Sequence, residues 1–188
     1  MAIWVALIRG INVGGNNIIP MRALAETFER AGMRDVKTYI QSGNVLFRSD
    51  IVNARTLEKR LEKAIDKAHG CDVKVVVRSR EELDVLVKKL PPDWKKPSVK
   101  KRYYVLFLRH DVDSKDALGH VKAKEGVEEI VYRPGVLLWS ALIAKITRSS
   151  IAKLTQTPLY KDVTIRNLNT TLKLHALAKA LDQPPKAI

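Results

Sequence analysis

The order of apolar patterns in the first 77 residues most constrains the fold of this chain. Four strand-like runs of apolar and β-branched residues lie at residues 2–9, 36–40, 45–47 and 73–77. Helical patterns separate the first run from the second and the third from the fourth, and each ends before a glycine, Gly32 or Gly70. The order strand-helix-strand-strand-helix-strand is that of a ferredoxin-like sheet.

The second half of the chain repeats this order in a weaker form. The stretch WVALIRGIN (4–12) can be laid over YVLFLRHDV (104–112), and TYIQSGNVLFRS (38–49) over EIVYRPGVLLWS (129–140). Helices are expected there at residues 113–121, near 149–154 and up to residue 181. We therefore predict an α+β protein of two ferredoxin-like (βαββαβ) halves with antiparallel sheets and additional helices. The predicted divisions are residues 1–90 with a trailing helix, a basic proline-rich linker at 91–101, and residues 102–188 with a C-terminal helix.

Two polar turns are expected to meet in the first half. The first and third strands of a ferredoxin-like sheet are antiparallel neighbours, so the end of one lies beside the start of the other. The first turn also leads into a helix, whose free N–H groups favour an anion. The predicted ligand-binding residues of these turns are Arg9, Asn12, Gly14, Gly15, Asn16, Asn17, Gln41, Ser42, Gly43 and Asn44. Asn and Gly are also common turn residues, so the alternative is that the two turns only bond each other.

The segment TIRNLNTTLKL (164–174) has a similar polar character. Asn167 is predicted to cap the last helix, and the predicted ligand-binding residues here are Arg166, Asn167, Asn169 and Lys173. A capped surface helix without a ligand is the alternative. The basic segment 95–102 is a second candidate contact, or else a solvated linker.

The charge balance favours an anionic partner. Lys and Arg number 34 against 20 Asp and Glu, a formal net charge of +14, which attracts nucleic acid, nucleotides or acidic proteins. The longest apolar run, residues 136–144, is far shorter than the ~20 residues of a membrane helix. A single cysteine and the absence of an export-signal pattern predict a cytoplasmic protein.

Other sites are not indicated by the sequence. The glycines of GINVGG do not have the spacing of a phosphate-binding loop or a dinucleotide fingerprint. The four histidines are scattered without metal-ligand spacing, and Cys71 has no obvious histidine partner. The central strands of the first half carry too few aromatic residues for a standard RNA-recognition motif. We predict no metal, no cofactor and no membrane contact.

Taken together, the stretches RGINVGGNN…PM, YIQSGNVLF and RNLNTTLKL resemble a bacterial family, the domain of unknown function 1697. The resemblance runs from the first residues to about residue 181. It implies two ferredoxin-like halves and no established activity, cofactor or catalytic set. This chain has Ile18 where the family commonly has lysine, and Leu168 where it usually has tryptophan.

The sequence as a whole favours a cytoplasmic, non-catalytic binding protein for an anionic ligand, with nucleic acid or a nucleotide as the best candidate. One alternative is an enzyme acting on a small phosphorylated or amide-bearing metabolite. No carboxylate, histidine or thiol lies within the three motifs to serve as a general base or nucleophile, although catalysis stays open. Another alternative is a protein–protein interaction module.

Overall fold

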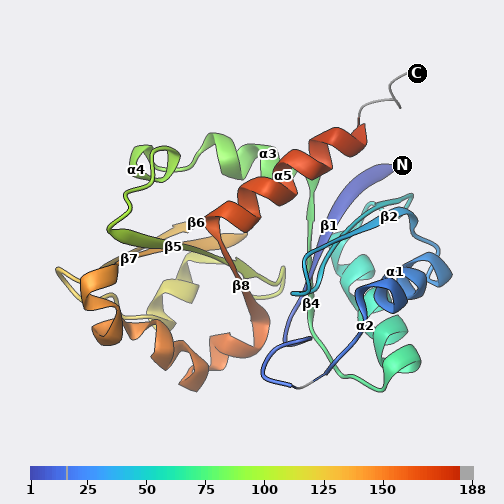
Figure 1. Cartoon of the computed structure of the whole chain (residues 1–188), viewed down its shortest axis with the longest axis horizontal. Coiled ribbons are helices and arrows are strands. Elements are labelled where there is room, and N and C mark those ends of the chain that lie inside the picture. The colour runs from blue at the N-terminus through green and yellow to red at the C-terminus, as the bar shows by residue number, and fades with distance from the viewer. Residues whose placement is uncertain (16, 183–188) are drawn as a thin grey trace. The chain divides into compact units, whose positions relative to one another are not determined.

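The computed structural model describes residues 1–15 and 17–182, which form two compact units (Figure 1). Of the described residues, the first unit contains 1–15, 17–85 and 172–182, and the second contains 86–171. This division differs from the predicted one. The boundary falls inside helix α3 (Arg80–Lys88), and most of helix α5 (Leu168–Asp182) belongs to the first unit.

The first unit has the predicted ferredoxin-like order. Its elements are β1 (Ala2–Ile8), α1 (Met21–Arg30), β2 (Arg34–Tyr39), β3 (Asn44–Ser49), α2 (Ala54–His69) and β4 (Val75–Ser79). The strands form an antiparallel sheet in the order β2-β3-β1-β4. Helices α1 and α2 cover one face of this sheet, where apolar side chains of helices and strands form a buried core (Figure 1).

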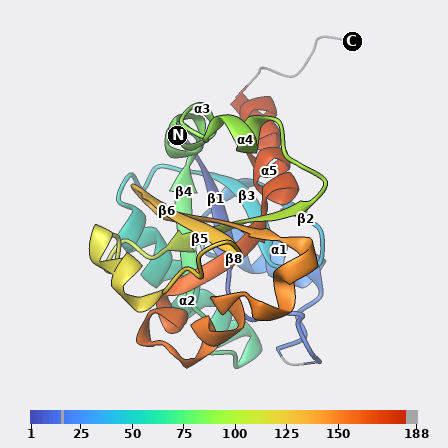
Figure 2. The same ribbon diagram turned by 90° about the vertical axis from the view of Figure 1, so that its left-hand side faces the viewer.

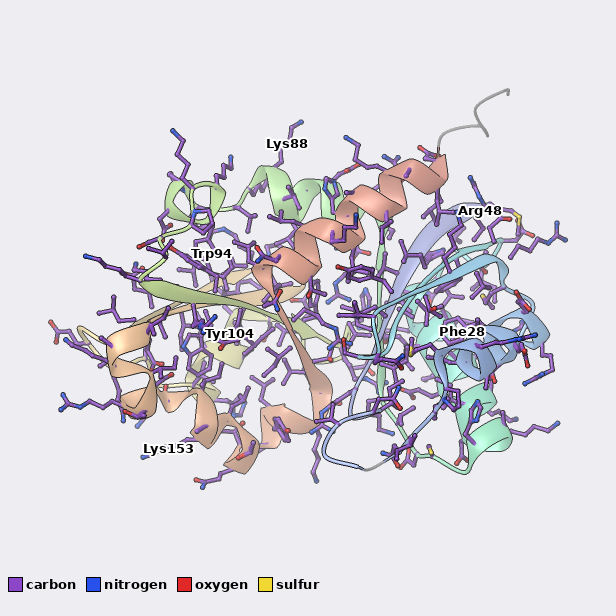
Figure 3. All side chains as sticks on the ribbon, viewed as in Figure 1. Phe28, Arg48, Lys88, Trp94, Tyr104 and Lys153 are labelled. Atoms are coloured by element: carbon purple, nitrogen blue, oxygen red, sulfur yellow. The ribbon has the colours of Figure 1, made fainter. Side chains whose placement is uncertain are left out.

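Local residue chemistry explains the helices of this unit. Leu24 and Phe28 are fully buried on α1 (Figure 3 labels Phe28). The ring of Phe28 meets that of Phe47 edge to face, with centroids 5.5 Å apart. Helix α2 is capped at its start by Asn53, whose side chain accepts a hydrogen bond from the backbone N–H of Thr56 at 2.9 Å. It ends at Gly70, which has φ +63°.

Helices α3 and the later part of α5 are also fastened by specific contacts in the first unit. Ser79 and Glu82 form a reciprocal capping box at the start of α3, with hydrogen bonds of 2.7 and 3.1 Å. On α5, Nε2 of His175 lies 2.6 Å from Oδ1 of Asp84. This hydrogen bond lowers the pKa of Asp84, and the desolvation of the carboxylate offsets part of the shift.

The second unit has the same strand order with different connections. Strands β5 (Lys101–Leu108), β6 (Glu128–Arg133), β7 (Val136–Leu142) and β8 (Val163–Asn167) form an antiparallel sheet in the order β6-β7-β5-β8. Figure 2 labels β5, β6 and β8 of this sheet. The helices predicted at 113–121 and 149–154 are 3₁₀ helices. The 3₁₀ helices of this unit are η1 (Lys115–His120), η2 (Ile143–Arg148), η3 (Ser150–Gln156) and η4 (Pro158–Asp162).

The segment predicted as a linker contains a short helix. Helix α4 (Pro92–Lys95) buries Trp94, which Figure 3 labels. The ring centroid of Trp94 lies 5.1 Å from that of Tyr103. The hydroxyl oxygen of Tyr103 accepts a hydrogen bond from the backbone N–H of Ser98 at 3.1 Å. These contacts fasten part of residues 91–101 to the second unit.

The central strands of the two sheets, β1 and β3 in one and β5 and β7 in the other, correspond residue by residue. Ile8 N donates to the carbonyl of Gly43, and Leu108 N donates to that of Gly135. Gly43 therefore corresponds to Gly135, and the overlay of 38–49 on 129–140 expected from the sequence is wrong by one residue in its second strand. The overlay of 4–12 on 104–112 keeps its register, since the pairs Trp4–Phe47 and Tyr104–Trp139 match.

The fourth strands carry a further repeat. Nη1 of Arg78 donates to the carbonyl of Val77 at 2.7 Å, and Nη1 of Arg166 donates to that of Ile165 at 2.8 Å. Each arginine is followed by the capping residue of a helix, Ser79 for α3 and Asn167 for α5. No helix in the described part of the chain is long and apolar enough to cross a membrane.

Candidate functional site

The side chain of Asn12 joins the two predicted turns of the first unit. Its Nδ2 donates to the carbonyls of Ile19 and Gln41, each at 2.9 Å, and its Oδ1 accepts from the N–H of Ile19 at 2.8 Å. Asn12 has φ +55°, a conformation that asparagine tolerates better than most residues. The predicted adjacency of the two turns is therefore confirmed.

The neighbouring residues of these turns also bond within the protein. Nδ2 of the fully buried Asn44 donates to the carbonyl of Tyr39 at 3.1 Å and to Oγ of Ser42 at 3.2 Å. Nδ2 of Asn17 donates to the carbonyl of Gly10 at 3.1 Å. The asparagine amides therefore hold the turns in shape.

The outer surface of these turns is mainly backbone and aliphatic. Gly14 and Gly15 are exposed, with φ +60° and +80°, and a Cβ on either would meet nothing within 4 Å. Gln41 is exposed, whereas Arg9 and Ser42 are half-buried. Asn16 lies outside the described residues. The large exposed apolar side chains here are Val13, Ile18 and Ile40.

The C-terminal motif divides into buried and exposed residues. Asn167 caps α5 as predicted, since its Oδ1 accepts from the N–H of Thr170 at 2.7 Å. Asn169 and Lys173 are exposed on α5. Arg166 is only 8% exposed, and its Nη1 donates to Oγ1 of Thr164 at 2.9 Å. Burial lowers the pKa of Arg166 to about 10.

The pairing of β5 with β8 places the basic segment 95–102 beside the C-terminal motif 164–174. β5 and β8 are antiparallel neighbours in which Tyr104 is paired with Asn167, so the start of β5 lies beside the start of α5. A concavity of about 440 Å³ lies at this place, and we call it the β5–α5 pocket. Its lining residues are Pro97, Ser98, Val99, Lys101, Arg102, Tyr103, Tyr104, Ile143, Asn167, Leu168 and Asn169.

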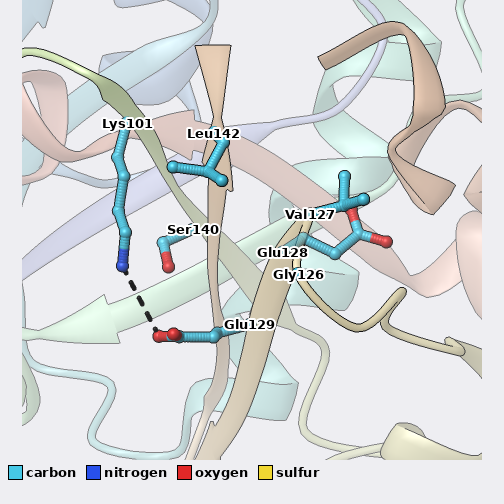
Figure 4. A pocket seen from close by; sticks show the side chains of 7 residues that line it. All are labelled: Lys101, Gly126, Val127, Glu128, Glu129, Ser140 and Leu142. Atoms are coloured by element: carbon cyan, nitrogen blue, oxygen red, sulfur yellow. Dashed lines mark ion pairs between the residues drawn. The ribbon is translucent and has the colours of Figure 1, made fainter. Parts of the chain in front are cut away.

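The cations of the β5–α5 pocket are not equivalent. Nζ of Lys101 lies 3.7 Å from Oε2 of Glu129, at the edge of a smaller cavity of about 120 Å³ (Figure 4), and 3.8 Å from a carboxylate oxygen of Asp93. Arg102 is exposed, and none of the described acidic side chains forms an ion pair with it. Arg102 is therefore the cation of this pocket that is available to a ligand.

The internal repeat supplies a comparison for the start of α5. The corresponding first turn of α3 carries Glu81 and Glu82, and Glu82 closes the capping box on Ser79. In α5 these positions hold Asn169 and Thr170, and its first turn has no acidic residue. The partial positive charge at the start of α5 is thus not balanced by a carboxylate of its own first turn.

Sequence reasoning named the basic segment and the C-terminal motif separately and missed Tyr104 as a residue between them. The signal was present, because the first and fourth strands of a ferredoxin-like sheet are antiparallel neighbours. It also missed Glu128, a buried carboxylate that accepts hydrogen bonds from Trp139 Nε1 at 2.9 Å and from the side chains of Ser149 and Ser150.

Residues 1–15 and 17–182 contain no group of three or more His, Cys, Asp or Glu side chains that could hold a metal ion. The thiol of Cys71 is half-buried and donates to the carbonyl of His69 at 3.4 Å.

Comparisons with known proteins agree with the fold. A solved structure of a conserved bacterial protein from Streptococcus pneumoniae is similar to this chain, with a TM-score of 0.82 and 25% sequence identity. The similarity covers 94% of this chain and 98% of that one. No curated protein matches the sequence. The family model described as "Protein of unknown function (DUF1697)" matches residues 1–139, and the chain belongs to this family.

Proposed function

We propose that this protein binds an anionic ligand, nucleic acid or a nucleotide, and that the β5–α5 pocket is its site. The observation that supports this proposal is the meeting of Arg102, the half-buried ring of Tyr104 and the acid-free start of α5 around one concavity. A cytoplasmic location is part of the proposal, since the single cysteine, Cys71, suits a reducing compartment.

The charges at the pocket favour a phosphate group. Arg102 presents a planar guanidinium that can bind two phosphate oxygens at once. The 15-residue helix α5 adds the partial positive charge of its N-terminus. In the first unit the corresponding helix start is occupied by Glu81 and Glu82, which would repel an anion. The start of α5 therefore favours a negatively charged ligand, whereas the start of α3 does not.

The remaining lining groups suit a nucleotide. Tyr104 offers an aromatic ring for a base, and Val99 and Ile143 add exposed apolar surface, at 90% and 38% exposure. The exposed amide of Asn169 supplies hydrogen-bond donors and an acceptor at the helix start. The net charge of +14 adds phosphate affinity that does not depend on base sequence.

The polar turns of the first unit remain a predicted contact for a ligand of the same class. The part of them that suits a ligand is the exposed backbone of Gly14 and Gly15, because the amides of Asn12 and Asn44 bond within the turns.

A salt-dependent titration tests the proposal. Fluorescently labelled single-stranded RNA is titrated with the protein at about 50 mM and about 200 mM salt. We expect binding that weakens steeply with salt, and in the Arg102→Ala variant a weaker affinity and a salt slope reduced by about 1. The control is Lys89→Ala, which removes one exposed charge from the same unit outside the pocket. Absence of binding by the unmodified protein at low salt, or equal losses in both variants, would overturn the proposal.

A further inference from the structure

A second concavity of the second unit carries a concentrated positive charge. It has a volume of about 350 Å³ and lies between the segment that follows η1 and helix η3. Its lining includes Lys122 and Lys124 from the first wall and Lys153 from η3 (Figure 3 labels Lys153). His120 lines the same concavity. We call it the lysine pocket.

The three lysines of the lysine pocket form no ion pair within the described part of the chain. None of Lys122, Lys124 and Lys153 has an acidic side chain within ion-pair distance among residues 1–15 and 17–182, and no carboxylate lines the concavity. Three ammonium groups around one hollow repel one another and attract an anion of more than one charge.

A buried carboxylate fixes both walls of the lysine pocket. Oε1 of Glu128 accepts the backbone N–H of Lys124 at 3.2 Å on one wall. On the other wall it accepts the backbone N–H of Ser150 at 2.9 Å and the Ser150 hydroxyl. Glu128 is 7% exposed, so these hydrogen bonds are shielded from water. The two walls are therefore held at a fixed separation before any ligand arrives.

The inner surface of the lysine pocket is apolar. Leu154 is 1% exposed and Val121 is half-buried, and both line the concavity. A free inorganic anion would leave this surface uncovered, whereas an organic phosphate would cover it.

We propose that the lysine pocket binds a soluble organic diphosphate, with its phosphates on the three lysines and its organic part on Val121 and Leu154. This site is separate from the β5–α5 pocket, with which it shares no lining residue. The lysine pocket can therefore bind its ligand whether or not the β5–α5 pocket binds one.

Calorimetric titrations with ADP, inorganic pyrophosphate and adenosine test this site. We expect ADP to bind more tightly than pyrophosphate, and adenosine to give no heat of binding. Lys153→Ala and Lys124→Ala are each expected to weaken ADP binding about tenfold, the loss of one charge-assisted contact. Lys88→Ala is the matched control, since Lys88 is an exposed lysine of the same unit outside the pocket (Figure 3).

The variant Arg102→Ala separates this proposal from the previous one. ADP is a nucleotide, which the β5–α5 pocket would also take, so ADP is titrated into this variant. We expect Arg102→Ala to keep the ADP binding of the lysine pocket, and the double variant Arg102→Ala/Lys153→Ala to weaken that binding about tenfold. Lys153→Ala is expected to weaken RNA binding no more than Lys88→Ala does. Three results would overturn the lysine pocket: no heat with ADP at millimolar concentration, equal weakening in Lys88→Ala, or loss of ADP binding in Arg102→Ala alone.

Discussion

The side-chain amide of Asn12 donates a 2.9 Å hydrogen bond to the carbonyl oxygen of Gln41, a residue 29 positions later in the chain. This bond joins the turn after β1 to the turn before β3. Because Asn12 also bonds to the backbone of Ile19, we expect its side chain mainly to stabilise the first unit.

Replacing Asn12 by glycine is expected to destabilise the protein by about 2 kcal/mol, because the side chain loses three hydrogen bonds to backbone groups and a weaker one to Sδ of Met21. Glycine adopts the positive φ of +55° without strain, so the variant tests the loss of the side-chain hydrogen bonds. The measurement is the free energy of unfolding in urea. Asn17→Gly is the control with a single side-chain bond at a similar φ, and we expect it to cost about 0.5 kcal/mol. Equal losses would contradict a special role for Asn12.

A methyl group at Gly43 is expected to cost about 3 kcal/mol or more. Gly43 has φ +69°, and an added Cβ would lie 2.9 Å from Cγ1 of Ile11 and 3.1 Å from Cβ of Ile8. At Gly14, which has φ +60°, an added Cβ would have no atom within 4 Å. Gly14→Ala should therefore lower the free energy of unfolding only through the strain of a non-glycine residue at positive φ, by about 1 kcal/mol. Thermal unfolding of both variants gives the comparison, and similar melting temperatures would refute the close approach at Gly43.

Ile40 lies in the left-handed region with φ +50°, which is costly for a β-branched residue. Its side chain is 49% exposed, so little packing is lost when it is replaced. Ile40→Asn is therefore expected to raise the free energy of unfolding by about 0.5 kcal/mol. Ile18→Asn, at 72% exposure, serves as the control and should change it by less than about 0.5 kcal/mol. Destabilisation by Ile40→Asn alone would show that Ile40 makes contacts that offset its strain.

The carboxylate of Glu128 is expected to make stability depend on pH in the acid range. Burial raises the pKa of this carboxyl, but hydrogen bonds from Ser149, Ser150 and the backbone lower it further, so the pKa lies below its ordinary value of 4.5. A lowered pKa in the folded state gives a stabilisation that is complete above pH 4.5 and is lost as the pH falls through the folded-state value.

Glu128→Gln tests this dependence. The amide cannot accept all the hydrogen bonds made to the carboxylate, so we expect the free energy of unfolding in urea to fall by about 3 kcal/mol at neutral pH. We also expect this free energy to depend less steeply on pH in the acid range. Glu129→Gln removes the neighbouring carboxylate, whose side chain is 71% exposed, and should cost less than about 1 kcal/mol. If the free energy of unfolding of Glu128→Gln falls with acid pH as steeply as that of the unmodified protein, other carboxylates cause the pH dependence.

Strand order and turn chemistry made part of this structure predictable. The meeting of Asn12 with Gln41 follows from the place of the first and third strands, and the cap at Asn167 follows from its position before an apolar helical pattern. The two strand orders also follow from the alternation of apolar patterns.

Long-range packing decided what the sequence did not predict. The burial of Arg166 depends on what covers its face of the sheet, and no local pattern carries that information. Glu128 meets Ser149 and Ser150 across 21 and 22 positions through a run of 3₁₀ helices, for which periodicity gives little signal. The sequence overlay set Asn44 on Gly135, whereas Gly43 is the residue that corresponds to Gly135, because apolar residues alone do not fix a register.

Cross-linking locates the proposed ligand site most directly. Single-stranded RNA containing 4-thiouridine is irradiated with the protein at low salt, and the attached peptides are identified by mass spectrometry. The proposed function predicts adducts in the segments that contain Arg102, Tyr104 and Asn169, and their loss at high salt. Adducts confined to residues 9–17 and 41–44, or none above the high-salt background, would contradict it.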